Sequence, residues 1–156
     1  MLLSGVNHVA IVTRDLDTFV EFYTDVFGVD VVFRDDDPRL RHAILRTGPE
    51  SWLHPAELAG NVHARAKPDM FQRGHLDHIA LVAADRGAFE TIRKRLIERQ
   101  ASDGLVEDLG AFQSLWFEDP DGMRGEITII VDPTLAGIHE PRPLARETGT
   151  ATSGQT

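Results

Sequence analysis

Residues 7–12 read Asn-His-Val-Ala-Ile-Val, and residues 77–82 read Asp-His-Ile-Ala-Leu-Val. The two stretches are 70 residues apart, and the similarity continues in register beyond them, where Phe19 corresponds to Phe89. A single hexapeptide match can arise by chance, whereas a match that continues into the next element indicates duplication. We therefore interpret the chain as two copies of one structural unit.

Each copy contains the same order of predicted elements, namely one strand, one helix and three further strands. In the first copy, Asp15 is suited to cap a helix and Gly28 to end it. Shorter strands are expected after the two helices, at residues 29–34, 41–46, 51–58, 105–109, 113–118 and 125–131. The predicted class is α+β, with two βαβββ modules at about residues 4–60 and 74–132.

These modules make up a single domain over residues 1–132, with residues 61–73 as the linker between them. A chain of 156 residues is long enough to bury a core without disulfide bonds. Residues 133–156 are expected to form a C-terminal tail that is poorly ordered. The reason is that the sequence ends in Gly-Thr-Ala-Thr-Ser-Gly-Gln-Thr, which offers no large apolar side chain to bury.

The composition excludes several classes of protein. The formal charge is −9, so an acidic surface would repel nucleic acid. The absence of cysteine excludes disulfide bonds and thiolate ligands. No apolar run reaches the length of a membrane span, and Met1–Gly5 lacks the features of a secretory signal, so a cytoplasmic location is expected.

Two histidines and one glutamate are candidate metal ligands. His8 and His78 occupy equivalent positions in the opening strands, and Glu126 lies on the polar face of a strand whose other face is apolar. Two imidazoles and a carboxylate suit divalent Fe, Mn, Ni, Co or Zn, so we predict one such ion bound by these three residues. The other interpretation is that the histidines are hydrogen-bonded core residues and that Glu126 is paired with Arg124.

The repeat also predicts a fourth position. When residues 43–58 are laid on residues 115–130 without gaps, His54 corresponds to Glu126. Pro55 removes a strand donor at this place, so the strand lies at an edge or bends there. His54 is thus either a fourth ligand or a wall of the pocket.

The paired modules resemble the vicinal oxygen chelate superfamily. The resemblance rests on the histidine in each opening strand and on Phe-Glu-Asp-Pro-Asp-Gly, residues 117–122, before the strand that carries Glu126. It covers about residues 5–132 and implies that the modules form a curved mixed sheet, a funnel with the helices outside. It also implies that His8, His78 and Glu126 match the family's ligand positions.

The same resemblance implies a metal-dependent enzyme whose small-molecule substrate chelates the metal through neighbouring oxygens. His54 falls where glyoxalase- and epimerase-type members have a fourth ligand, usually Glu or Gln, which favours isomerase or lyase chemistry. With three ligands, the alternative is an extradiol-type Fe(II) dioxygenase acting on a catechol-like substrate. His63 lies about where that branch has an acid–base histidine, but the usual tyrosine is missing. A third alternative is an antibiotic-sequestering protein of the bleomycin resistance type, although that branch lacks metal ligands.

Further residues are candidates for the substrate pocket. They are polar and aromatic side chains on the same strand faces as the predicted ligands or beside them: Trp52, His42, Trp116, Ser114, Arg124, Phe71 and Phe112. The resemblance also implies a homodimer, since family members often pair modules across subunits. The sequence leaves open whether the site forms within one chain or between two.

Overall fold

The computed structural model describes residues 7–61, 76, 78–135 and, for the backbone only, 138–143. The first module contains β1 (His8–Val12), α1 (Leu16–Phe27), β2 (Asp30–Asp37), β3 (Leu40–Gly48) and β4 (Ser51–Leu58). The second contains β5 (Ile79–Val82), α2 (Arg86–Glu98), β6 (Glu107–Gly110), β7 (Phe112–Glu118) and β8 (Arg124–Ile130). The predicted α+β class with two βαβββ modules is confirmed.

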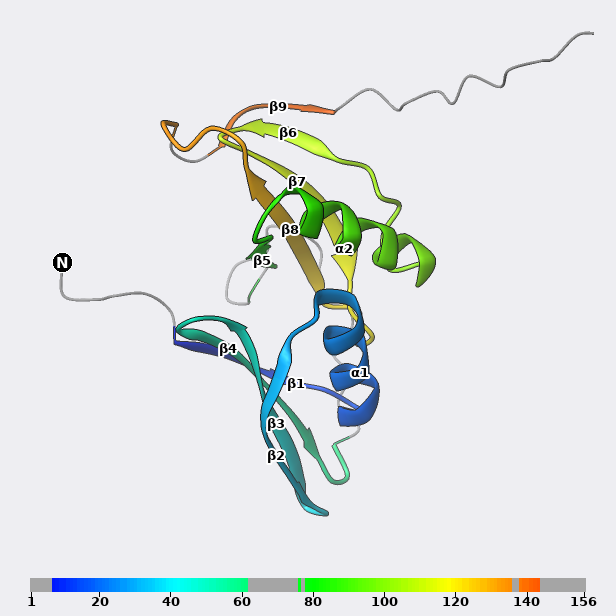
Figure 1. Cartoon of the computed structure of the whole chain (residues 1–156). Helices are drawn as coiled ribbons and strands as arrows, with labels where there is room; N and C mark the ends of the chain where they lie inside the picture. Colours follow the sequence, from blue (N-terminus) through cyan, green and yellow to red (C-terminus); the bar gives the residue numbers. More distant parts are fainter. Residues whose placement is uncertain (1–6, 62–75, 77, 136–137, 144–156) are drawn as a thin grey trace, which may run out of the picture.

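The strands form two mixed sheets of matching topology. Their orders are β1-β4-β3-β2 and β5-β8-β7-β6, and the first strand of each module runs parallel to its last. The register is also the same, because Ala10 pairs with His54 and Ala80 pairs with Glu126. The curved sheet that the resemblance implies is therefore divided, within this chain, into two sheets that lie one above the other in Figure 1.

One strand was not predicted. β9 (Ile138–Pro143) pairs antiparallel with β6 and extends the second sheet at its edge. It falls within the segment for which the sequence predicted a poorly ordered tail. The strand contains two prolines, and proline is tolerated in a strand at the edge of a sheet because no neighbour there needs its missing N–H.

The helix boundaries follow the predicted capping residues. The Asp15 carboxylate accepts a hydrogen bond from the backbone N–H of Thr18, and Asp85 does the same for Ala88 in α2. Gly28 ends α1 in the left-handed region at φ 67°, and its N–H donates to the carbonyl of Thr24 at 2.9 Å.

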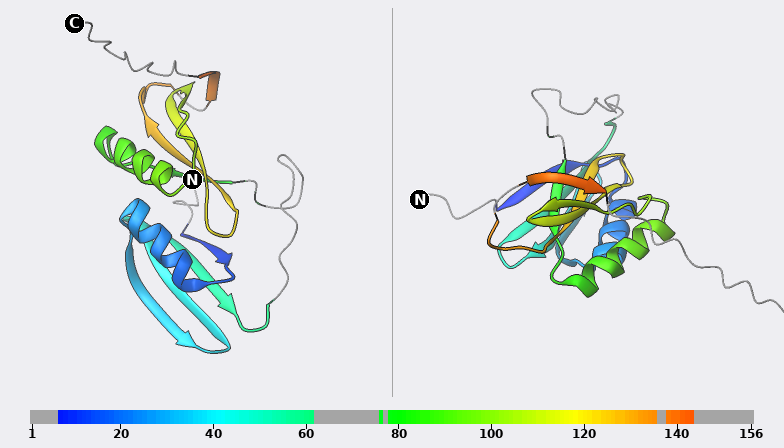
Figure 2. Two further views of the ribbon diagram at one scale, coloured as in Figure 1. Left: turned by 90° about the vertical axis from the view of Figure 1, so that its right-hand side faces the viewer. Right: turned by 90° about the horizontal axis from the view of Figure 1, so that it is seen from above.

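The core lies between the sheets and the helices. In β1, Ile11 is buried and Val9 packs against the core, whereas His8 and Val12 are exposed, so the predicted alternation is confirmed. The helices α1 and α2 are in contact and cover their sheets from the same side of the molecule (Figures 1 and 2). The opposite faces of the sheets carry the candidate ligands.

Among the contacts that join the modules, two fix β7 and the turn that follows it. The ring of Phe117 on β7 lies 5.2 Å from the ring of Phe27 on α1, measured between centroids. The hydroxyl of Tyr23 donates to the carboxylate of Asp119 at 3.4 Å, and both side chains are buried. The turn that follows β7 is therefore fixed to the helix of the first module.

Neither helix in the described part of the chain is long and apolar enough to cross a membrane.

Candidate metal centre

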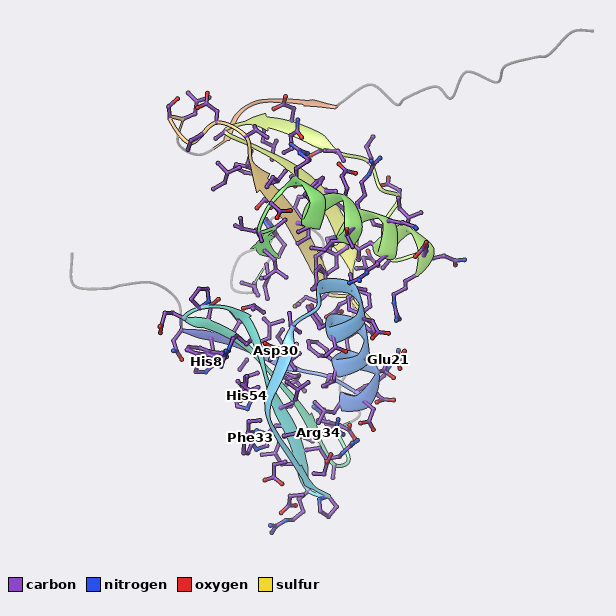
Figure 3. The ribbon with its side chains drawn as sticks, viewed as in Figure 1. His8, Glu21, Asp30, Phe33, Arg34 and His54 are labelled. Carbon is purple, nitrogen blue, oxygen red and sulfur yellow. The ribbon has the colours of Figure 1, made fainter. Side chains whose placement is uncertain are left out.

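Three histidines gather on the first sheet. His8 on β1, His42 on β3 and His54 on β4 lie on the face that points away from α1. The ring centroids of His8 and His54 are 5.9 Å apart, and those of His42 and His54 are 5.1 Å apart. Nδ1 of His42 and Nε2 of His54 are joined by a hydrogen bond of 3.0 Å. Figure 3 shows His8 and His54 on the side of this sheet opposite to α1.

The surroundings of His54 favour its neutral form. Its partial burial and the neighbouring His42 and His8 lower the pKa of His54. A neutral imidazole keeps a lone pair on one nitrogen, which metal coordination requires. His54, which the repeat aligns with Glu126, is thus favoured in the neutral form that can bind a metal ion.

The second sheet carries a glutamate, and a histidine directly precedes its strand β5. Glu126 on β8 is only 6% exposed. Its Oε1 accepts a hydrogen bond from the hydroxyl of Ser114 on β7, and its Oε2 lies 3.5 Å from Nε2 of His78. The ring of Trp116 meets the His78 ring edge-on, with 4.7 Å between centroids. Glu126 is therefore in contact with His78, whereas the alternative interpretation pairs it with Arg124.

His8 also differs from that alternative. It is exposed and hydrogen-bonded through Nδ1 to the side chain of Asn7 at 2.9 Å, so it is not a core histidine. The other predicted first-sheet residue, Trp52, is half-buried on β4 and pairs with His8 in the parallel register. Phe112 begins β7 and is also half-buried. His63 and Phe71 lie outside the described residues.

The two modules repeat this arrangement at the level of side chains. His42 pairs with Ala56 across β3 and β4, as Ser114 pairs with Thr128 across β7 and β8. His42 consequently contacts His54 in the first module where Ser114 contacts Glu126 in the second. The sequence placed His42 and Ser114 on the pocket-facing sides of their strands, but only the structure shows that each one is hydrogen-bonded to a candidate ligand.

A cleft of about 760 Å³ opens between the C-terminal end of α2 and β7, and its lining residue Trp116 contacts the candidate ligand His78. Trp116 and Arg124 line it, together with Leu105, Glu107 and Glu118. Trp116 therefore borders both this cleft and His78. Sequence reasoning missed the contribution of Leu105 and Glu107, because the path of the segment after α2 depends on contacts with β7 that leave no local sequence signal.

The candidate ligands are divided between the two sheets. Among the described residues, no three His, Asp or Glu side chains form a group that could hold a metal ion. His8 and His54 belong to the first sheet, whereas Glu126 belongs to the second and its contact His78 directly precedes β5 of that sheet. One chain therefore presents two pairs of donors, each on the face of its sheet that the helices leave uncovered.

Comparison with known proteins identifies the fold. The structure is similar to a glyoxylase/bleomycin resistance protein/dioxygenase domain from Frankia sp. EAN1pec, at 23% identity over 84% of this chain and 95% of that chain, with a TM-score of 0.67. It is also similar to a lactoylglutathione lyase from Agrobacterium tumefaciens (20% identity, 83% and 96% covered, TM-score 0.60). A third similar structure is a fosfomycin resistance protein from Listeria monocytogenes, complexed with Mn(II) and 1S,2S-dihydroxypropylphosphonic acid (16% identity, 83% and 95% covered, TM-score 0.58).

No curated protein sequence matches this chain. A family profile does match it, over residues 5–127, which include the first module, the second as far as the middle of β8, and every candidate ligand. That span agrees with the extent of the resemblance that the two strand motifs and the Phe-Glu-Asp-Pro-Asp-Gly turn predicted. The chain belongs to the Glyoxalase/Bleomycin resistance protein/Dioxygenase superfamily.

Proposed function

We propose that this protein is a metal-dependent enzyme whose active site forms between two copies of the chain. In this arrangement, His8 and His54 of one subunit share a divalent ion with His78 and Glu126 of the partner subunit. The observation that carries the proposal is the division of the donors into two pairs, on equivalent faces of two equivalent sheets. A twofold dimer brings the first module of each subunit to the second module of the other and completes two identical sites.

The faces that carry the donors also have the character of an interface. Val12 is 58% exposed on the face of His8, and Val82 and Ile130, on the faces of His78 and Glu126, are 64% and 56% exposed. Exposed apolar side chains that gather on one face are typical of an interaction surface. A second copy that covers these faces removes the side chains from water and supplies the missing donors.

The donor set fits a transition metal. Neutral imidazoles with one carboxylate suit Fe, Mn, Ni, Co or Zn, and the Glu126 carboxylate is already buried and hydrogen-bonded by Ser114. When bound, such an ion supplies a Lewis acid that stabilises negative charge on a substrate oxygen.

The protein's own residues account for substrate binding. The cleft beside Trp116 accommodates the organic part of a small molecule, with the indole as an apolar wall and Arg124 as a cationic partner for a polar substituent. The position of His54 at the register of Glu126 favours four protein ligands, and with them isomerase or lyase chemistry on a substrate with neighbouring oxygens.

Mixing two inactive variants tests the shared site. His8→Ala removes a metal ligand from the first module, and Glu126→Gln removes one from the second. Each variant alone is therefore expected to lose zinc. In randomly paired dimers of the two, half of the molecules are mixed, and each mixed dimer has one site made of two intact modules. Zinc content is therefore expected to recover to about one quarter of the wild-type value on co-expression. Elemental analysis of tag-free protein measures it.

The same experiment distinguishes the ways in which the proposal can fail. If each site formed within one chain, every site in the mixture would carry one defect and zinc content would stay at the level of the single variants. If either single variant bound zinc like the wild type, the ligand assignment itself would be wrong. The mixture of two His8→Ala preparations serves as the matched control, because it contains no intact site.

The chemistry is tested separately from the metal site. The metal-loaded protein is expected to exchange the C–H hydrogen beside the carbonyl of α-hydroxyketones with deuterium from the solvent, as NMR would show. Glu126→Gln is expected to slow this exchange by at least about 100-fold, because it loses the ion that stabilises the oxyanion, and one such interaction is typically worth that factor. Oxygen consumption with catechols in the presence of Fe(II), without such exchange, would overturn the isomerase or lyase assignment in favour of an extradiol dioxygenase.

A further inference from the structure

We propose that His42 is a positioning residue for the metal site, which accepts a hydrogen bond from Nε2–H of His54 and thereby leaves Nδ1 of His54 as the metal-binding atom. The inference rests on the proposed function, since it assigns a partner to one of the four proposed ligands. His42 itself touches neither metal nor substrate in this scheme.

The repeat supplies the first argument. Ser114 occupies the position in the second module that His42 occupies in the first. Each one pairs with the residue that lies two positions beyond the candidate ligand on the neighbouring strand. Ser114 donates to Oε1 of Glu126, and this leaves Oε2 directed at His78. In both modules, therefore, a side chain on the third strand binds one polar atom of the candidate ligand on the fourth. Metal-binding histidines and carboxylates commonly have such a partner, which fixes their orientation.

The tautomers supply the second argument. Nε2 of His42 lies 3.9 Å from Oδ2 of Asp35 on the neighbouring strand β2. A carboxylate on that side favours the proton on Nε2 of His42, because the negative charge attracts the N–H. Nδ1 of His42 then carries a lone pair and can only accept. In the 3.0 Å contact, the proton is therefore on Nε2 of His54. His54 with its proton on Nε2 has its lone pair on Nδ1.

One other role of His42 is compatible with the same contact. Two donor nitrogens on one ion, with bonds of about 2.1 Å, are themselves about 3.0 to 3.4 Å apart, depending on the coordination geometry. A direct ligand and a positioning residue therefore look alike in this distance, and the experiment must separate them. The two roles differ in which nitrogen of His54 binds the metal and in whether a side chain without a ring can replace His42.

NMR of the metal-free protein with ¹⁵N-labelled histidine gives a readout that does not depend on activity. Long-range proton–nitrogen correlations at alkaline pH are expected to show His42 and His54 both with the proton on Nε2. Addition of Zn²⁺ is expected to shift Nδ1 of His54 and to leave both nitrogens of His42 in their metal-free pattern. A His54 ring with its proton on Nδ1, or a zinc-induced change of the His42 ring to a metal-coordinated or Nδ1-protonated pattern, would overturn the proposal.

Variants give the second readout. His42→Ala is expected to lower the Zn²⁺ affinity by about 10- to 100-fold, measured by competition with a chromophoric chelator. His42→Asn places an acceptor oxygen near the position of Nδ1 and is expected to recover most of that loss. In a His54→Ala background, His42→Ala is expected to add no further loss, because a positioning residue acts only through the side chain that it positions.

The outcomes separate this inference from the proposed function. If His8→Ala and His54→Ala both retained wild-type Zn²⁺ affinity, the metal site itself would be wrong. If they lost it and His42→Ala did not, only the role of His42 would fail. If His42→Asn failed to recover affinity and His42→Ala weakened binding further in the His54→Ala background, His42 would be a ligand. Ser114→Ala is the matched variant in the second module, where the same loss is expected through Glu126.

Discussion

Gly125→Ala is expected to lower the free energy of unfolding by about 3 kcal/mol, at the upper end of what overpacking costs in a protein core. Gly125 pairs directly with Phe117 across β8 and β7, and a Cβ at this position would overlap the Phe117 ring. The ring cannot move aside freely, because it is 3% exposed and packs against Phe22 and Phe27 of α1, with centroid distances of 6.3 and 5.2 Å. The missing side chain at Gly125 thus makes room for the ring that joins the two modules.

Urea denaturation at one fixed protein concentration measures this effect, since dimerisation would make stability depend on concentration. Phe117→Leu provides the control. It removes the ring that the new Cβ meets, so Gly125→Ala should cost much less in the Phe117→Leu background than in the wild type. An equal cost in both backgrounds would show that the destabilisation has another origin than this overlap.

Asp119→Asn is expected to stabilise the protein at neutral pH and to remove part of its pH dependence. Burial raises the pKa of Asp119 to about 6, against the hydrogen bonds that its carboxylate accepts from the backbone N–H groups of Met123 and Asp121. Burial also raises the pKa of Tyr23, so this hydroxyl stays protonated and donates to the second carboxylate oxygen. Asparagine retains an oxygen for the two backbone donors but carries no charge into the buried site.

The sign follows from proton uptake. Between pH 3.8, the ordinary pKa, and about 6, the folded protein binds a proton at Asp119 that the unfolded chain does not bind. The contribution of this proton therefore stabilises the fold at low pH and is lost as the pH rises through about 6. Two pKa units correspond to at most about 3 kcal/mol, which is the expected advantage of Asp119→Asn above pH 7.

Chemical denaturation of both proteins from pH 4 to pH 8 tests this prediction. The advantage of Asp119→Asn should shrink towards pH 4, where the wild-type carboxyl is protonated as well. A difference that stays constant over this range would contradict the assigned titration. Tyr23→Phe is the companion variant: it removes a donor to the ionised carboxylate and should make the pH dependence of stability steeper.

Much of the fold could be predicted because its signals are local. The alternation in β1, the cap at Asp15 and the left-handed Gly28 each depend on a few neighbouring residues, and all three are present in the structure. The strand bounds were also close, and β4 (Ser51–Leu58) agrees at both ends. β9 was not predicted because it is stabilised by backbone pairing with β6, and the composition of residues 138–143 is not typical of a strand.

The duplication can be recognised in the sequence alone, and it determined the order of elements and the equivalence of His54 with Glu126. The reason is that two copies of one sequence pattern form the same strand pairings, so that equivalent residues take equivalent places in the two sheets. Only the tertiary structure decided which side chains meet. In the structure, Glu126 contacts Ser114 and His78, and His42 is hydrogen-bonded to His54. The two donor pairs lie with separate sheets. These contacts join residues 12 to 48 positions apart through strand pairing and the docking of one module on the other, and no local pattern encodes them.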